Sequence, residues 1–320
     1  MIETSSSVPL VRTTCPVCHD TDAAPFLTVP DRFELQAGEP YHLVRCRKCS
    51  LIYLNPRPDE SVSGRFYEHE AYTPFVSTAG EAGATARLYT HLRTLNNRWK
   101  RRLIEKYSGR QGRLLDVGCG TGEFLHEMQA AGWQVRGVER DARAAAYAVE
   151  ALRLPVIRGD LDALPSPDES FDVITAWHVL EHLYEPHRAI VRMRDLLKKG
   201  GLLIIAVPNA ASLDARVYGQ NWIAYDTPRH VQHFTPRALR MMMEMHGFEK
   251  RSMRSLHLDA LFNALMSAQL GAQRSGSSTA GKLLRLVQAG GVGLAALLAG
   301  VLSADMRNYV GSTLLTVWRK

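Results

Sequence analysis

The sequence lacks a run of apolar residues at its start that could form the core of a signal peptide, since it begins MIETSSSVPLVRTTCP. We therefore expect a cytoplasmic protein. Cysteine is also scarce, with five residues in the chain, and cytosolic thiols are kept reduced, so disulfide bonds are not expected. At 320 residues, the chain can form one large core and a smaller satellite domain.

Most of the chain also lacks an excess of either charge, although the formal net charge is +7. The excess lies in residues 250–320, and residues 1–249 are neutral overall. A general phosphate-binding surface is therefore not expected over that first part, which disfavours nucleic acid as a partner. The basic segment suits an anionic membrane surface or a phosphorylated substrate as well as it suits RNA. Its charged residues are Lys250, Arg251, Arg254, Arg274, Lys282, Arg285, Arg307, Arg319 and Lys320 against Asp259 and Asp305.

Four of the five cysteines form two matched pairs, Cys15-Pro-Val-Cys18 and Cys46-Arg-Lys-Cys49. Two such pairs can supply four thiolates in tetrahedral geometry around one zinc ion. Four thiolates leave no open position for water, so this zinc would be structural rather than catalytic. We predict a zinc ribbon over residues 1–60 that ends in the rigid turn of LIYLNPRP.

Residues 61–110 are predicted to form a helical linker or cap. In ARLYTHLRTLNNRWKRRLIEKY, apolar residues recur at steps of three and four, which places them on one helix face. Tyr67 and Tyr72 precede this helix, where they could close over a bound ligand or pack within the junction.

A ligand-binding turn is indicated by RLLDVGCGTGEF, in which a short apolar strand runs into a glycine-rich turn and then a helix. Gly118, Gly120 and Gly122 would let the backbone approach a ligand, and the helix start offers unpaired N–H groups to a carboxylate or phosphate. A dinucleotide fingerprint needs a small residue where Glu123 stands, so a pyrophosphate is disfavoured.

Two downstream acids suggest which ligand this turn holds. Glu139 ends the next predicted strand, at a distance suited to a carboxylate that accepts hydrogen bonds from both ribose hydroxyls. Asp160 ends a third predicted strand, where it could accept a hydrogen bond from an adenine amino group. An adenosyl ligand without a pyrophosphate is S-adenosylmethionine.

These segments, together with GVERDA, KKGGLLIIAVPN and HFTPRALRMMMEMHGF, resemble a class I S-adenosylmethionine-dependent methyltransferase over most of residues 111–255. The resemblance implies that Asp116 and the turn from Gly118 to Gly122 hold the methionine end of the cofactor. It implies that Glu139 holds the ribose and that Asp160 and the Leu161 amide hold the adenine. It also implies that His178 lines the methyl-transfer side, with a catalytic role.

The alternation of strands and helices predicts an α/β, Rossmann-like domain over residues 111–320, with the site at the carboxyl ends of a mostly parallel sheet. Six strands are expected near residues 114–117, 134–138, 155–158, 171–176, 202–207 and 248–255. The family resemblance implies a seventh strand, residues 312–318, that inserts antiparallel between the fifth and the sixth.

The segment HVLEHL places His178, Glu181 and His182 beside the predicted cofactor. A related group of quinone and small-RNA methyltransferases has Glu-x-x-Glu-His here and binds a divalent ion. Because His178 stands where the first Glu should be, metal-dependent catalysis is not favoured, although the three side chains remain possible ligands. The alternative is that Glu181 and His182 orient the helix that follows.

The loop AYDTPRHVQHFTP resembles bacterial methyltransferases with the same zinc ribbon, including sugar C-methyltransferases in which a His acts as general base. His230 is the preferred base, because a neutral imidazole can take a proton from a hydroxyl or an acidic carbon. Tyr225, Arg229 and His233 are expected to contact substrate, with Arg229 on a substrate phosphate or on an internal carboxylate.

The leading hypothesis is methyl transfer to a small or lipid-linked nucleophile, a sugar among the candidates. A zinc-ribbon RNA methyltransferase is one alternative, but TAWHVLEHL lacks the Asn/Asp-Pro-Pro-aromatic element usual in base N-methyltransferases. A non-catalytic cofactor-binding module is the other, and the intact glycine and acidic positions argue against it. The acceptor atom and the oligomeric state stay open.

An apolar, basic insertion is predicted at residues 257–305, between the sixth and seventh strands. Two apolar arms with a polar turn between them predict a helical hairpin. The uncharged stretch 286–304 is nearly long enough to span a bilayer, but both flanking strands pair in one sheet, which excludes a single crossing. The hairpin is expected to lie at the inner face of the membrane, or to serve as a packing or dimer element.

Overall fold

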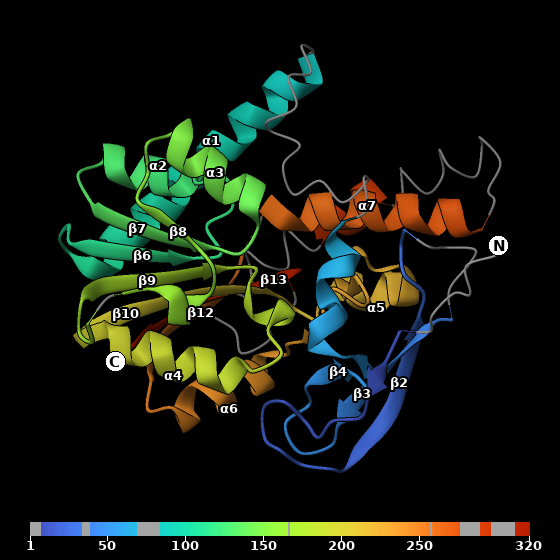
Figure 1. Ribbon diagram of the computed structural model, residues 1–320. Helices are drawn as coiled ribbons and strands as arrows, with labels where there is room; N and C mark the ends of the chain where they lie inside the picture. Colours follow the sequence, from blue (N-terminus) through green and yellow to red (C-terminus); the bar gives the residue numbers. More distant parts are fainter. Residues whose placement is uncertain are drawn as a thin grey trace, which may run out of the picture.

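The computed structural model describes residues 8–33, 39–68, 84–165, 167–256, 258–275, 289–295 and 311–320. A seven-stranded sheet forms the centre of the larger part, with helices on both faces, and a smaller four-stranded sheet lies beside it (Figure 1). The α/β class expected from the sequence is therefore confirmed.

The large sheet has the order β12-β13-β10-β9-β6-β7-β8. Its strands are β6 (Arg113–Val117), β7 (Gln134–Glu139), β8 (Val156–Arg158), β9 (Phe171–Trp177), β10 (Leu197–Pro208), β12 (Glu249–Leu256) and β13 (Thr313–Arg319). β13 pairs antiparallel with both β10 and β12, whereas β10, β9, β6, β7 and β8 pair parallel. The predicted insertion of the last strand between the fifth and the sixth is confirmed.

The inner strands are apolar and buried on both faces, as parallel strands covered by helices usually are. On one face lie α1 (Ala84–Ser108), α2 (Glu123–Ala130) and α3 (Ala142–Glu150), and on the other lie α4 (Pro186–Leu196) and α6 (Pro236–Met245) (Figure 1). Each face has its own cluster of buried side chains. The helices cover both faces of the sheet, and the carboxyl ends of its parallel strands face the small sheet and the insertion (Figure 1).

The small sheet joins three N-terminal strands to a segment that follows β10. Its order is β11-β4-β3-β2, with β2 (Ala23–Val29), β3 (Tyr41–Cys46), β4 (Ile52–Leu54) and β11 (Gln232–His233). A separate two-stranded pair, β1 (Leu10–Val11) and β5 (Arg57–Pro58), and the short helix η1 (Glu60–Tyr67) complete the N-terminal unit. Because β11 comes from the loop that was predicted to contact substrate, this loop is held by the N-terminal unit.

The insertion begins with α7 (Leu258–Arg274), and a second helical stretch at 289–295 packs against it. Ala289 packs with Ala264 and Ala268 of α7. A Cβ added to Gly293 would lie 3.1 Å from the Cα of Leu261, so the two helices approach closely here. The rest of the predicted insertion lies outside the described residues.

Within the described ranges, no helix combines the length and the apolar character needed to cross a membrane.

Candidate active site

The glycine turn after β6 has a backbone that ordinary side chains would disfavour. Gly118 and Gly122 have φ values of 67° and 85°. A Cβ on Gly118 would come within 2.7 Å of the Val179 side chain, whereas a Cβ on Gly120 would meet no protein atom within 4 Å. The turn is therefore pressed against the segment after β9 on one side and open on the other.

Glu139, at the end of β7, is tied to this turn. One carboxylate oxygen accepts a hydrogen bond from the Gly120 N–H and the other from the Asp141 N–H, both at 2.8 Å. Each oxygen has a second lone pair, so the carboxylate can also accept bonds from ligand hydroxyls. These contacts place Glu139 beside the glycine turn.

Asp160 caps the short helix η2 (Leu161–Ala163). Its Oδ1 accepts hydrogen bonds from the N–H groups of Asp162 at 3.0 Å and Ala163 at 3.3 Å. Leu161 is buried beneath the turn, and Asp160 is exposed. Asp160 and Leu161 thus follow the third strand of the parallel set, next to the strand that ends in Glu139.

Asp116 is a buried carboxylate on β6 whose Oδ1 accepts a 2.6 Å hydrogen bond from the Thr175 hydroxyl. Burial raises its pKa to about 7, Glu139 adds to the rise, and Thr175 and Lys100 partly offset it. A buried carboxylate with a raised pKa beside a glycine turn is typical of a ligand-binding site.

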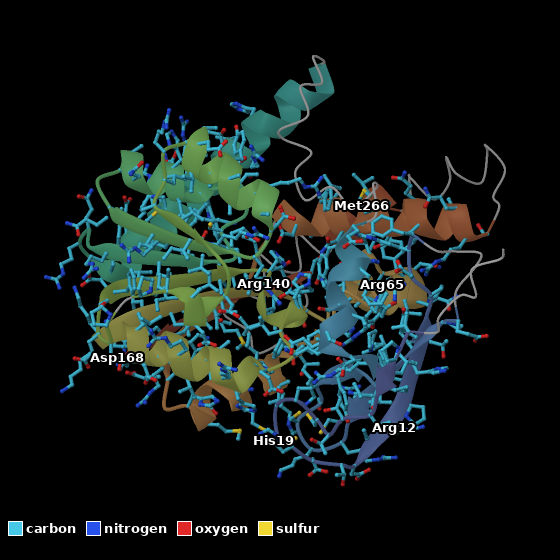
Figure 2. All side chains as sticks on the ribbon, in the orientation of Figure 1. Arg12, His19, Arg65, Arg140, Asp168 and Met266 are labelled. Atoms are coloured by element: carbon cyan, nitrogen blue, oxygen red, sulfur yellow. The ribbon has the colours of Figure 1, made fainter. Side chains whose placement is uncertain are left out.

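The carboxyl edge that carries these residues faces the N-terminal unit. Arg140, directly after Glu139, lies between the sheet and η1, which carries Arg65 (Figure 2). The predicted cofactor residues on the first two parallel strands therefore gather at one edge of the sheet.

His178, directly after β9, has a left-handed backbone, with φ 57°. Its Nδ1 lies 3.3 Å from Glu181 Oε1 and its Nε2 lies 3.4 Å from Asp259 Oδ2. Burial acts to lower the pKa of His178, but the two carboxylates outweigh burial and raise it to about 9. His178 is therefore a cation between two acids at neutral pH, which argues against its service as a proton acceptor or a metal ligand.

Glu181 also belongs to a second group of side chains, together with His182 and His230. Ligand atoms of Glu181, His182 and His230 lie within 4.8 Å of one another. The Nδ1 of His182 lies 3.1 Å from the Arg229 carbonyl, and the Nδ1 of His230 lies 2.8 Å from the Ala224 carbonyl. A carbonyl only accepts, so each Nδ1 donates and each Nε2 has a free lone pair. The sequence grouped His178 with Glu181 and His182, but the structure puts His230 in that place.

The Glu181 carboxylate is 1% exposed, and apart from the ion pair with His178 neither oxygen has a hydrogen-bond partner in the part of the chain that the structure describes. Burial acts to raise its pKa, but the neighbouring His178 outweighs burial and lowers it to about 2. Burial, with a smaller effect from His182, lowers the pKa of His230 to about 4. The group thus offers one carboxylate and two imidazole nitrogens, which is a donor set that could hold a divalent ion.

The structure corrects the expectation that Arg229 contacts substrate. Its guanidinium is fully buried and pairs with Asp31 at 2.6 Å and Asp226 at 2.9 Å. It also lies over the Phe33 ring. The internal-carboxylate alternative holds, since the buried Arg229 guanidinium joins the loop to the N-terminal unit and is not exposed to a ligand.

Tyr225 and His233 are likewise placed in the interior rather than at a substrate surface. Each is 1% exposed, and their rings contact each other edge to face at 5.1 Å. Burial raises the pKa of Tyr225 and lowers that of His233 to about 3. Neither His233 nitrogen has a hydrogen-bond partner among the described residues. Tyr72, the remaining substrate candidate, lies outside the described residues.

Tyr67 was named with Tyr72 as a residue that could close over a ligand, whereas Lys100 and Asp259 were not expected at this site from the sequence. Tyr67, on η1, lies 3.0 Å from His182 Nδ1 through its hydroxyl. The Lys100 ammonium lies 4.2 Å from the Trp177 ring centre and is attracted to Asp116 and Asp259. Lys100 belongs to a helix interpreted as a linker or cap, and Asp259 to the insertion. No local motif marks either, because each reaches the site only through the tertiary fold.

The four predicted zinc ligands converge. The Sγ atoms of Cys15, Cys18, Cys46 and Cys49 lie within 4.8 Å of one another, with Cys15–Cys49 at 3.4 Å and Cys18–Cys46 at 3.5 Å. Sulfur atoms bound tetrahedrally at zinc–sulfur distances of about 2.3 Å stand about 3.8 Å apart. The cluster therefore fits a zinc ion.

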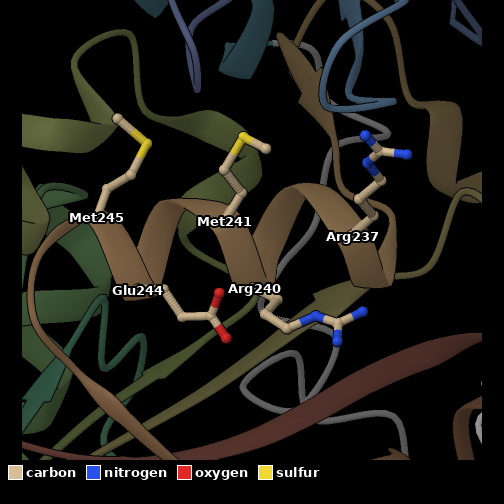
Figure 3. Close-up of a pocket in the computed structure, with 5 residues that line it drawn as sticks. All are labelled: Arg237, Arg240, Met241, Glu244 and Met245. Atoms are coloured by element: carbon tan, nitrogen blue, oxygen red, sulfur yellow. The ribbon is translucent and has the colours of Figure 1, made fainter.

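A surface hollow lies on α6, away from the glycine turn. Figure 3 shows its lining, which comes from that one helix: Arg237, Arg240, Met241, Glu244 and Met245. None of these residues belongs to the predicted site, so we do not assign the chemistry to this hollow.

Comparisons with known proteins agree with the geometry. A family model described as a methyltransferase domain matches residues 89–253, just over half of the chain. A ubiquinone biosynthesis O-methyltransferase of Maricaulis maris is 31% identical over 152 residues, which are 44% of this chain and 60% of that protein. A probable S-adenosylmethionine-dependent methyltransferase of Mycolicibacterium smegmatis is 26% identical over 190 residues, 58% of this chain and 68% of that protein.

Among solved structures, an S-adenosylmethionine-dependent methyltransferase from Archaeoglobus fulgidus aligns over 71% of this chain and 94% of its own, with 20% identity and a TM-score of 0.48. The chain spans 60% of the length of the Maricaulis relative. The family match, the strand order and the placement of Glu139 on the glycine turn lead to one conclusion. The chain belongs to the class I S-adenosylmethionine-dependent methyltransferases.

Proposed function

We propose that this protein transfers the methyl group of S-adenosylmethionine to a hydroxyl oxygen or an acidic carbon of a small or lipid-linked molecule, a sugar among the candidates. The observation that carries the proposal is the pair of imidazoles, His182 and His230, whose Nδ1 atoms are held by backbone carbonyls. This leaves one Nε2 acceptor on the segment after β9, which borders the glycine turn through Val179, and one on the loop that carries β11. The Maricaulis relative, by its name an O-methyltransferase of ubiquinone biosynthesis, supports an oxygen acceptor.

In this proposal the acceptor proton moves to His230 Nε2 as the acceptor attacks the methyl carbon. The electrons of the carbon–sulfur bond pass to sulfur, which leaves S-adenosylhomocysteine. With a pKa of about 4, His230 is neutral at pH 7 but binds a proton weakly. The ionised Glu181 would stabilise the imidazolium that forms. Most of the acceleration would come from orientation and exclusion of water.

The test is formation of S-adenosylhomocysteine with a panel of catechols, prenylated quinols and nucleotide sugars. His230→Gln is expected to lower kcat about 100- to 10,000-fold, as loss of a general base does. The matched control is His126→Gln, on the exposed side of α2. Undiminished turnover in His230→Gln would remove this base.

A divalent ion held by Glu181, His182 and His230 is a second candidate. It is favoured by the buried Glu181 carboxylate, which accepts no hydrogen bond from the described residues. Such an ion would orient and acidify a substrate hydroxyl. Titration of the protein with Mn²⁺, followed by electron paramagnetic resonance, tests it without an acceptor. One bound ion that is lost in Glu181→Gln would support this candidate, and equal binding by both proteins would contradict it.

We further propose that the four-cysteine cluster holds a structural zinc ion. The metal content of the purified protein tests this, with Cys46→Ser expected to lose about one zinc per chain. We do not favour nucleic acid as a partner, and strongly salt-dependent RNA binding would contradict that view.

We also propose contact with a membrane surface through α7. Leu261, Phe262 and Leu265 are exposed on this helix, and Leu294 is exposed on the helical stretch packed beside it. Phe262→Asp should reduce sedimentation with anionic liposomes, whereas Val149→Asp, at an exposed apolar position on α3, should not. Equal sedimentation of both variants and wild type would leave packing or dimerisation as the role of this surface.

A further inference from the structure

Asp259 lies in the first turn of the insertion helix, yet its carboxylate reaches the carboxyl edge of the central sheet. Its Oδ2 is 3.4 Å from His178 Nε2 and accepts a 2.9 Å hydrogen bond from the hydroxyl of Thr313, at the start of β13. An insertion between the last two strands thus supplies an acid to the residue that follows β9.

The charges around Asp259 come from four separate elements. Glu181 faces the other nitrogen of His178, Lys100 of α1 attracts Asp259, and Asp116 of β6 attracts the same lysine. An acid lies at each nitrogen of His178, so the ring is attracted to a carboxylate on both sides. Without Asp259, one side of the ring would have no anchor.

Contacts other than Asp259 also hold α7 in place. Further along the helix, Ser267 is fully buried and accepts a 2.9 Å hydrogen bond from the Ile223 N–H. Ala264 and Ala268 pack in the same region. Asp259 adds its hydrogen bond from Thr313, and its contact with His178 is separate from these docking contacts.

We propose that Asp259 is a positioning residue for methyl transfer, which holds the His178 ring between its own carboxylate and that of Glu181 at the methyl-acceptor side of the cofactor site. The proposal rests on the proposed function in one respect, that this side of the sheet receives S-adenosylmethionine. The insertion is then part of the active site, and α7 sets the geometry in which the acceptor meets the methyl group.

The experiment uses the full chain labelled with 5-fluorotryptophan and followed by fluorine NMR. Trp177 directly precedes His178 and reports on the site. Trp222 directly precedes Ile223, whose N–H bonds the Ser267 hydroxyl of α7, and reports on the docking of that helix. The Trp177→Phe and Trp222→Phe proteins assign the two signals. The test variant is Asp259→Asn, which keeps the shape, Asp259→Glu restores the charge, and Gln269→Ala is the control on the exposed side of α7.

We expect Asp259→Asn to move the Trp177 signal and leave the Trp222 signal in place, with recovery in Asp259→Glu and no change in Gln269→Ala. With any acceptor found in the panel, kcat should fall about tenfold or more in Asp259→Asn, with less than about a twofold change in the affinity for S-adenosylhomocysteine.

An unmoved Trp177 signal would overturn the proposal, and so would equal movement of Trp177 and Trp222, which would mean that Asp259 only docks the helix. Failure of the proposed function has a different signature. In that case S-adenosylhomocysteine would shift no tryptophan signal of the wild-type protein, whatever residue stands at position 259.

Discussion

Replacement of Asp116 by asparagine is expected to stabilise the cofactor-free protein at alkaline pH. Burial raises the pKa of Asp116 from 3.8 to about 7. Below pH 3.8 the group is protonated in both the folded and the unfolded chain. As the pH rises toward 7, the unfolded chain releases this proton first, so the folded state loses stability, and above about pH 7 the full cost is present.

The shift corresponds to about 4 kcal/mol at pH 8 and about 2 kcal/mol at pH 5. The carboxamide introduced by Asp116→Asn would be neutral at every pH, and its oxygen can still accept a hydrogen bond from the Thr175 hydroxyl. Asp116→Asn should therefore unfold at a higher urea concentration than wild type, with a gain in the free energy of unfolding that is larger at pH 8 than at pH 5.

Urea unfolding of the two cofactor-free proteins, followed by circular dichroism at both pH values, measures this difference. The same substitution should weaken S-adenosylmethionine binding, because the ionised carboxylate attracts the cationic end of the cofactor. A variant less stable than wild type at pH 8, or a stability difference independent of pH, would refute the reasoning.

Further predictions concern the N-terminal unit. Arg229→Ala should lower the free energy of unfolding by about 3–5 kcal/mol, because it leaves Asp31 and Asp226 buried without their partner; a loss under about 1 kcal/mol in urea unfolding would contradict the buried network. Addition of a zinc chelator should lower the melting temperature of wild type but not of Cys46→Ser, and a chelator without effect on wild type would argue against a structural metal.

The sheet was predictable because its strands are short apolar runs, and such runs can be assigned as strands without knowledge of distant residues. The glycine turn and Glu139 were predictable for a related reason, since both end such strands and lie at the same edge of the sheet. The early start of β10 at Leu197 was missed because the run begins with Lys198, Lys199 and a glycine pair, and a register irregularity joins it to the apolar part.

The environment of the loop residues was not predictable from local pattern. Arg229 finds its acid 198 residues away at Asp31, and Tyr225 is buried by strands of the N-terminal unit. His230 was expected to act as a lone base, but in the structure its ring contacts that of His182 edge to face, with centroids 4.5 Å apart. Asp259 was counted only among the charges of residues 250–320, because nothing near it in the sequence indicates His178.

The most direct test of the central claim is calorimetric titration of S-adenosylhomocysteine into wild type, Glu139→Gln and the exposed control Glu150→Gln. Glu139 is the acid that the structure ties to the glycine turn, and a hydrogen bond to a charged group contributes about 1.5–3 kcal/mol. We predict one binding site in wild type and in the control, with affinity about 10- to 100-fold weaker in Glu139→Gln. No binding by wild type, or unchanged affinity in Glu139→Gln, would contradict the assignment of this edge of the sheet as the cofactor site.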